Sequence, residues 1–333
     1  MRGARLVLAG AFTAILAACG GGGGSSSSTG TLKLGVTDAP VDVATQVVVQ
    51  FTGVELKPVG GKAFSIDFAA PQSIDLLDQQ GTQRAMLLGD ATVPAGNYEW
   101  LRLKVNAEPN VVDSFIAINA GDQCELRIPS GAETGLKVIH GFTVGVGSVT
   151  DLTIDFDLRK SVVQPPGQKS EPTTCGGQAY LLKPVLRIVD NLQVGAIAGT
   201  VDSNLIGAGN CPTSPASPGN VYLFGPYLSG TDPVPVPDDY DQNPDDAPGP
   251  IASAKVDPNT FTYTIGFVPE GQYVVAYTCD VDNAMLDANV IPPGGTVPDE
   301  VVNFTSPQEP PPVNVVRNQT TMANFVYVPP PAP

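Results

Sequence analysis

Apolar and polar residues alternate along most of this 333-residue chain, in short runs separated by turn residues. The first run, 31–36, alternates as a half-buried strand must, and a turn is expected at 37–40. The second run, around 47–56, changes its apolar phase after Gly53, which predicts a β-bulge there. Further runs of the same kind predict strands at 73–77, 85–88, 98–105, 114–118 and 124–128.

The clearest alternation lies near the middle of the chain. Residues 136–144 place His140 among apolar neighbours on one strand face, so we expect a core or half-buried histidine. Residues 152–158 are apolar on one face and carry Asp151, Thr153, Asp155 and Asp157 on the other. That polar face is expected to be solvated, as in a sandwich strand with one wet side. A strand at 180–189 closes this first unit.

The second half repeats the pattern more sparsely. Strands are predicted at 195–202, 220–224, 261–265, 272–278 and 320–328, with 261–265 and 272–278 paired across Pro269, Glu270 and Gly271. A Pro/Asp loop (232–250) and a Pro-rich connection (292–312) separate them. The chain contains 36 Gly and 33 Pro, and Pro inside a helix costs about 3 kcal/mol. We therefore predict an all-β protein with two tandem β-sandwich domains, at 31–191 and 192–333.

The N-terminus has the pattern of an export signal. Arg2 and Arg5 precede an apolar run at 6–18, which is typical of a secretory signal peptide and too short to cross about 30 Å of hydrocarbon. Cys19 follows the run Leu-Ala-Ala directly and so resembles the cysteine of a bacterial lipobox. The resemblance implies cleavage after residue 18, a lipid on Cys19 and a membrane anchor, with 19–30 as a flexible Gly/Ser tether. An ordinary signal peptide with a chance cysteine is the alternative.

The residue after the cysteine indicates which membrane would hold the protein. In lipoproteins that this chain resembles, an aspartate next to the lipidated cysteine often retains the protein at the inner membrane, whereas here Gly20 follows. We therefore expect a cell-envelope protein at the outer membrane.

The net charge of −16 is distributed unevenly. Residues 1–198 contain 18 acids and 15 bases, whereas 199–333 contain 15 acids and only the bases Lys255 and Arg317. Nucleic-acid binding needs a basic patch, so no nucleic-acid partner is expected. The acidic second half is compatible with a solvated, outward-facing domain or with cation binding.

Four cysteines remain after Cys19, with Cys124 and Cys175 in the first half and Cys211 and Cys279 in the second. Four cysteines allow three pairings. We predict Cys124–Cys175 and Cys211–Cys279, because each domain can then fold alone. A metal site would need closer cysteines, such as a C-x-x-C pair.

Four runs resemble a family of bacterial lipoproteins catalogued as domain of unknown function 4382. They are GVTDAP at 35–40, VPAGNY at 93–98, DFDLRKS at 155–161 and LKPVLR at 182–187. The resemblance covers about 30–190 and implies a β-sandwich on an envelope lipoprotein, without a known activity. In residues 194–282, G-x-V strands precede a G-x-Y-x-V strand. This order resembles the carboxypeptidase-regulatory or prealbumin-like sandwich, and the resemblance implies an accessory β-module.

Catalytic and metal chemistry has few candidates. His140 is the one histidine, and the chain has no nucleophile elbow, P-loop or dinucleotide fingerprint. Asp239, Asp241, Asn243 and Asp245 have the spacing of a calcium loop. This loop departs from the EF-hand pattern, because prolines occupy the positions of the turn glycine and the last glutamate. A solvated acidic loop without bound calcium is the alternative.

These observations predict a non-catalytic envelope lipoprotein that acts as a surface binding, adhesion or structural module. A polysaccharide, another envelope protein and calcium are the candidate ligands. Tyr98 and Trp100 are expected to share a strand face opposite Leu101, where they could form a ligand patch. The alternative is an accessory or catalytic component of envelope polysaccharide processing or transport.

Overall fold

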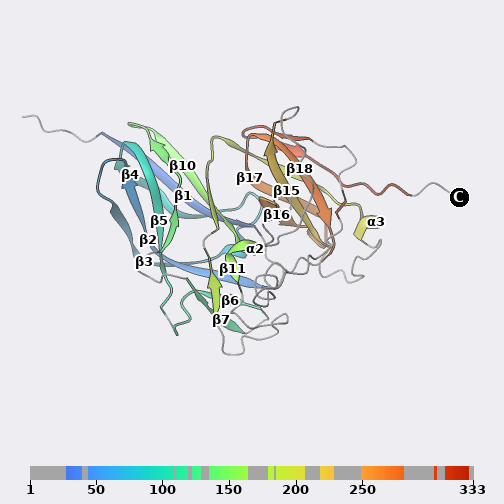
Figure 1. Cartoon of the computed structure of the whole chain (residues 1–333), viewed down its shortest axis with the longest axis horizontal. Helices are drawn as coiled ribbons and strands as arrows, with labels where there is room; N and C mark the ends of the chain where they lie inside the picture. The colour runs from blue at the N-terminus through green and yellow to red at the C-terminus, as the bar shows by residue number, and fades with distance from the viewer. Residues whose placement is uncertain are drawn as a thin grey trace, which may run out of the picture.

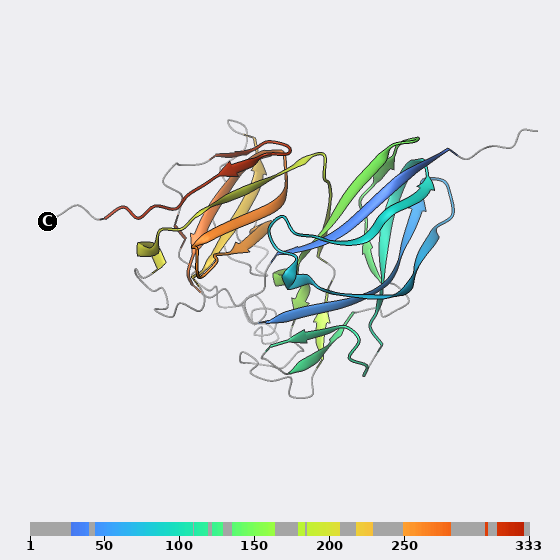
Figure 2. The same ribbon diagram turned by 180° about the vertical axis from the view of Figure 1, so that it is seen from behind.

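The computed structural model describes residues 28–39, 44–108, 110–118, 122–128, 135–163, 179–183, 185–206, 218–228, 249–280, 304–305 and 312–329. These residues lie almost entirely in β-strands, and Figures 1 and 2 show them as sandwiches side by side. The prediction of an all-β fold with tandem β-sandwiches is confirmed. Within the described ranges, no helix is long and apolar enough to span a membrane.

One sheet of the first sandwich has the strand order β13–β10–β1–β4. Its strands are β1 (Thr29–Ala39), β4 (Ala85–Pro94), β10 (Val149–Asp157) and β13 (Leu186–Asp190). β1 continues through Thr37 and Asp38, where a turn was expected, because the parallel ladder with β10 extends to its end and pairs Asp38 with Phe156. The two central strands therefore finish side by side at the same edge of the sheet.

The other sheet contains nine strands, most of them in the order β11–β12–β7–β6–β2–β5–β8. β2 (Gln46–Pro58) also pairs with β3 (Phe64–Asp75), and β5 (Gly96–Asn106) also pairs with β9 (Phe142–Val144). The remaining strands are β6 (Phe115–Ala117), β7 (Gln123–Arg127), β8 (Leu136–Val138), β11 (Val162–Val163) and β12 (Tyr180–Leu182). The predicted bulge is confirmed, since the register of β2 shifts between Phe51 and Gly53 against both β3 and β5.

The two sheets bury one continuous apolar core between them. Phe51 of β2 meets Phe156 of β10 edge to face, with ring centroids 6.3 Å apart. Both residues are fully buried, and such aromatic pairs add about 0.5–1.5 kcal/mol beyond the area they bury. The alternation seen in the sequence is thus the pattern of two inner sheet faces.

Two predicted strands of the first domain are each split in the structure. Residues 136–144 form β8 and β9, which pair with different stretches of β5 and leave 139–141 between them. His140 lies in that break and is exposed, so the expectation of a core histidine is wrong. Residues 180–189 likewise divide into β12 and β13, which belong to different sheets.

The second sandwich packs a three-stranded sheet, β17–β14–β20, against a four-stranded sheet, β16–β15–β18–β19. The strands are β14 (Val194–Thr200), β15 (Asn220–Tyr227), β16 (Ala252–Lys255), β17 (Thr262–Pro269), β18 (Gly271–Thr278), β19 (Val313–Val315) and β20 (Thr320–Met322). The expected pairing of β17 with β18 is wrong. β17 pairs with β14 and β18 pairs with β15, so the short connection at Glu270 crosses from one sheet to the other.

Three short helical turns complete the described fold: η1 (Leu76–Asp78), α2 (Leu158–Ser161) and α3 (Ser203–Ile206). α2 follows β10 directly and lies between the two sandwiches (Figure 1). The side chain of Arg159, a residue of α2, contacts the second sandwich, so α2 marks the place where the two domains meet.

Candidate functional site: the domain junction

The end of β10 and the helical turn α2 carry side chains from the first sandwich into the second. Asp157 caps α2, because its Oδ1 accepts a hydrogen bond of 3.3 Å from the Lys160 backbone N–H. Arg159 is only 3% exposed. Its guanidinium lies 5.3 Å from the ring centre of Tyr222 on β15, and its Nε donates to Ser253 Oγ on β16 at 3.3 Å. Arg159 is therefore a cation buried against two strands of the other domain.

Lys160 adds a second polar contact across the junction. Its Nζ donates to the backbone oxygen of Pro250 at 2.7 Å and lies 3.7 Å from Asp157 Oδ2. The lysine therefore links the helix cap of the first domain to the backbone just before β16.

Two glycines bring the backbones of the domains together at another point of the junction. A Cβ added to Gly266 of β17 would lie 2.0 Å from the carbonyl oxygen of Gly81. Gly81 itself has a left-handed backbone, with φ of +64°, which favours glycine. The close approach therefore depends on the lack of a side chain at Gly266.

The polar face of β10 is largely covered, contrary to the expectation of a solvated face: its middle residues are buried, and Asp151 and Asp157 are half-buried. Thr153 is 0% and Asp155 8% exposed. β10 is an interior strand, and Arg187 from neighbouring β13 covers this face and forms an ion pair with Asp155. Tyr273 of the second sandwich lies near enough to interact with Arg187. Strand alternation alone could not show that a second domain shields this side.

Burial raises the pKa of two carboxyl groups at the junction, Asp38 and Asp157. The pKa of Asp38 lies well above its usual range, because the group is buried and because Asp155 and Asp157 are nearby, although Lys255 opposes this shift. Neither carboxyl oxygen of Asp38 has a well-formed hydrogen bond. The backbone N–H of Leu158 nevertheless lies close enough to stabilise the charged form and so to oppose the rise in pKa. For Asp157, burial raises the pKa to about 6, against the opposing effect of Lys160.

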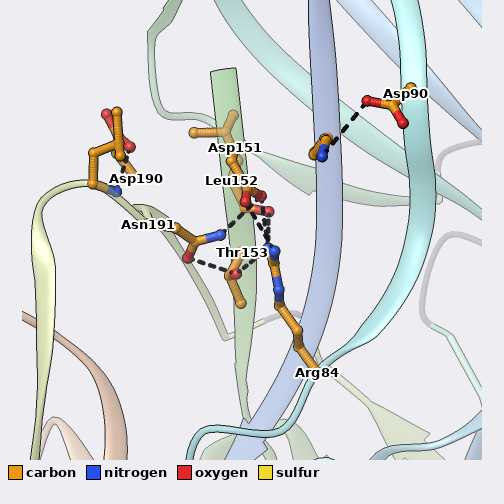
Figure 3. Close-up of polar contacts among 9 residues, drawn as sticks. Arg84, Asp90, Asp151, Leu152, Thr153, Asp190 and Asn191 are labelled. Carbon is orange, nitrogen blue, oxygen red and sulfur yellow. Dashed lines mark hydrogen bonds and ion pairs between the residues drawn. The ribbon is translucent and has the colours of Figure 1, made fainter. Parts of the chain in front are cut away.

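A polar network holds the connection between the domains in place, as Figure 3 shows. Arg84, just before β4, forms a two-pronged ion pair with Asp151, at 2.7 and 2.9 Å. Asn191, in the connection, donates to the same carboxylate at 2.9 Å and accepts from Thr153 Oγ1 at 2.9 Å. Burial alone would raise the pKa of Asp151, but the hydrogen bonds and charge of Arg84 outweigh it and keep this pKa below its usual value. Asp151 is therefore a carboxylate at neutral pH.

A cavity of about 320 Å³ opens beside this network, with walls from both sandwiches. The residues that line it are Thr82, Arg84, Asn191, Val194, Gly195, Ala196, Phe267, Asn318, Gln319 and Thr320. Amides, hydroxyls and a single aromatic ring face one space, an arrangement suited to binding a small polar molecule.

Comparison with known proteins finds a family match in the first domain. Residues 29–184 match the family described as a domain of unknown function, DUF4382. The match agrees with the resemblance seen in the four sequence runs. Two of those runs, 35–40 and 155–161, include the paired ends of β1 and β10 and the helix α2. The sequence features of the DUF4382 region therefore include residues of the junction.

No curated protein matches the chain, and solved structures show distant likeness only. A leucine-rich repeat protein from Bacteroides thetaiotaomicron aligns at 10% identity and a TM-score of 0.21, over 90% of this chain and 26% of its own length. The TIE protein of Bacillus anthracis aligns at 10% identity and 0.18, over 89% and 34%. The minor pilin GBS52 of Streptococcus agalactiae aligns at 10% and 0.15, over 90% and 99%. The chain thus spans about a quarter to a third of the length of the first two structures.

The proposed aromatic patch of the DUF4382 domain is not formed. Tyr98 is 2% exposed, stacks on Phe142 at 4.8 Å and donates its hydroxyl hydrogen to the Pro94 oxygen at 2.7 Å. The register between β2 and β5 shifts at Glu99, one residue of β5 being extra there, so Tyr98 turns to the core while Trp100 stays on the outer face. Trp100 is half-buried, with Lys137 Nζ 4.4 Å from the centre of its ring.

The other predicted site residues fall partly outside the described structure. Cys124, which is 1% exposed on β7, and Cys279, which follows β18, are both disulfide-bonded. Cys175 and Cys211 lie outside the described residues, so the two predicted pairings stay predictions. The same is true of the lipidation site Cys19 and of the calcium loop 239–245. Elsewhere, in the part that the structure describes, no three His, Cys, Asp or Glu residues gather where they could hold a metal ion.

Sequence reasoning missed the residues that line the cavity. Arg84 is an isolated base before a strand, and Asn191 is one residue of a turn, so neither stands out from its neighbours. Phe267 has a φ of +53°, which is rare for an aromatic residue, but no local sequence pattern predicts it. Only the packing of the second sandwich on the first brings these residues together.

Proposed function

We propose that this chain is a non-catalytic, lipid-anchored module of the bacterial cell envelope, in which two β-sandwiches are joined rigidly to present a binding surface. The observation that carries the proposal is the buried polar junction around α2. Independent domains are normally joined by an exposed, flexible linker that few contacts cross, whereas here Arg159 of the first sandwich is buried against Tyr222 and Ser253 of the second.

The connection between the domains supports the same proposal. β13 ends at Asp190 and β14 begins at Val194, so only three residues join the sandwiches. The backbone N–H of Asn191 donates to the backbone carbonyl oxygen of Asp151 at 2.9 Å, and the backbone N–H of Leu192 donates to Asp190 Oδ1 at 2.9 Å. A connection that is short and hydrogen-bonded to the first sandwich leaves little freedom for the domains to move independently.

The sequence supports the placement in the envelope. Lipidation of Cys19 would anchor the chain, and a Gly/Ser sequence of the length of 20–30 would span roughly 18 Å if it behaved as a random coil. The DUF4382 domain would then stay near the membrane, and the acidic second sandwich would project away from it.

Fatty-acid labelling tests the anchor. We expect wild-type protein to incorporate a labelled fatty acid and to fractionate with the outer membrane, and Cys19→Ala to do neither. Ser25→Ala, in the tether, is the control and should behave as wild type. Equal label in wild type and Cys19→Ala would refute lipid anchoring.

A further inference from the structure

The cavity between the sandwiches has the features of a ligand site, and its chemistry selects the class of ligand. We propose that it binds a small neutral sugar unit of an envelope or environmental polysaccharide. This inference rests on the proposed function as a binding module and names the ligand class and the residues that bind it.

The position and size of the cavity limit the ligand. Small-molecule sites occur preferentially at domain interfaces and measure about 300–1,000 Å³. At about 320 Å³, this cavity lies at the lower end of that range. It therefore suits a short saccharide unit rather than a large cofactor.

The residues that line the cavity carry no unbalanced charge that would favour an ionic ligand. Arg84 is the one charged residue that lines the cavity, and its charge is balanced by the two-pronged pair with Asp151. The lowered pKa of Asp151 keeps that pair ionised at neutral pH. The ligand is therefore expected to be polar and uncharged.

The polar groups of the lining match sugar hydroxyls, each of which can both donate and accept a hydrogen bond. Asn318 and Gln319 come from the second sandwich, and Thr82 comes from the first. An amide side chain also offers both donors and an acceptor. The described hydrogen bonds of Gln319 use only its backbone, so its exposed side chain is available to a ligand.

Phe267 supplies an apolar surface beside these groups. Its ring is half-buried, and its backbone is held in the left-handed region next to Gly266 and the close contact with Gly81. Non-glycine residues in that region are strained and cluster at ligand sites. An aromatic ring next to amides and hydroxyls fits a sugar ring, which has an apolar face and polar edges.

A glycan array carrying neutral and acidic oligosaccharides tests the inference on the intact protein. We expect retention of neutral glycans, reduced at least tenfold by Phe267→Ala and by Gln319→Ala. Gln123→Ala, an exposed glutamine on β7, is the matched control and should bind as wild type. Near-UV circular dichroism of each variant checks that the sandwiches remain folded.

Three outcomes would overturn the inference: no neutral glycan retained, acidic glycans alone retained, or full binding by both cavity variants. None of these would affect the test of lipid anchoring. A chain that is lipidated and rigid but retains no sugar would refute the sugar site and leave the proposed envelope module standing.

Discussion

The close contact of Gly266 with Gly81 offers a small change with a large expected effect on the junction. In Gly266→Ala, the new Cβ would lie 2.0 Å from the Gly81 carbonyl oxygen and 2.6 Å from its carbonyl carbon. These are backbone atoms, so no side-chain rotation can relieve the clash. Reaching the 3.4 Å of ordinary van der Waals contact requires a displacement of about 1.4 Å.

That displacement must open the junction or distort β17. Overpacking of this kind costs about 1–3 kcal/mol. A displacement of 1.4 Å would also lengthen the 3.3 Å hydrogen bond from Arg159 to Ser253 beyond hydrogen-bond range if the domains part as rigid bodies. In domains of this size, 1 kcal/mol shifts Tm by about 2–4 °C, so we expect a decrease of roughly 2–12 °C.

Differential scanning calorimetry measures the effect. We expect wild type to melt in one transition, and Gly266→Ala to melt earlier or in separate transitions for the two sandwiches. Gly89→Ala is the matched control, because a Cβ at Gly89 meets nothing within 4 Å. A Gly266→Ala protein that melts with the same profile as Gly89→Ala would refute the close packing of the junction.

Four further predictions concern individual groups. Burial raises the pKa of Asp157 to about 6, so between about pH 4 and pH 6 the folded state holds a proton that the unfolded chain releases. Over that range, wild type should lose on the order of 3 kcal/mol of stability relative to Asp157→Asn. Equal pH profiles of the two proteins in urea unfolding would contradict this. Arg187→Met should cost about 3 kcal/mol, because it leaves the buried Asp155 side chain without its partner. Arg127→Met should cost much less, because Arg127, which pairs with Glu125, is itself exposed to solvent. Equal losses in chemical unfolding would refute the distinction. If Asp239, Asp241, Asn243 and Asp245 bind calcium, free calcium at a hundred times Kd should stabilise the fold by about 2.7 kcal/mol. The double variant Asp239→Asn, Asp241→Asn should abolish this gain in stability. An equal gain with sodium at matched ionic strength would leave charge screening as the explanation. Mass mapping should find Cys124 joined to Cys175 and Cys211 joined to Cys279, and a bridge between the halves would show that they are not independent folding units.

The fold class and much of the first sandwich followed from alternation, because an inner sheet face requires apolar residues at every second position. The bulge at Gly53 was also visible, as a change of apolar phase. Tyr98 was misplaced because the sequence analysis did not foresee the register shift at Glu99. The extra residue breaks the alternation there, so Tyr98 and Trp100 lie on opposite faces.

The junction could not be predicted from local patterns. The carboxylates of β10 alternate as solvated residues do, but Arg187 and the second sandwich cover them. The connection at Glu270 looked like a hairpin turn, although it crosses between sheets, since short turns between strands do not specify which partners the strands choose. The cavity depends on how two domains pack together, and its residues lie far apart along the chain.

Rigid coupling of the two sandwiches is the central claim, and residual dipolar couplings of the intact folded protein in a dilute aligned medium test it most directly. Backbone N–H couplings from β1, β2, β5 and β10 report the orientation of the first sandwich, and those from β14, β15, β17 and β18 report that of the second. The buried junction predicts that a single alignment tensor fits both sets. Two tensors of different magnitude would mean that the domains reorient independently, and would contradict the claim.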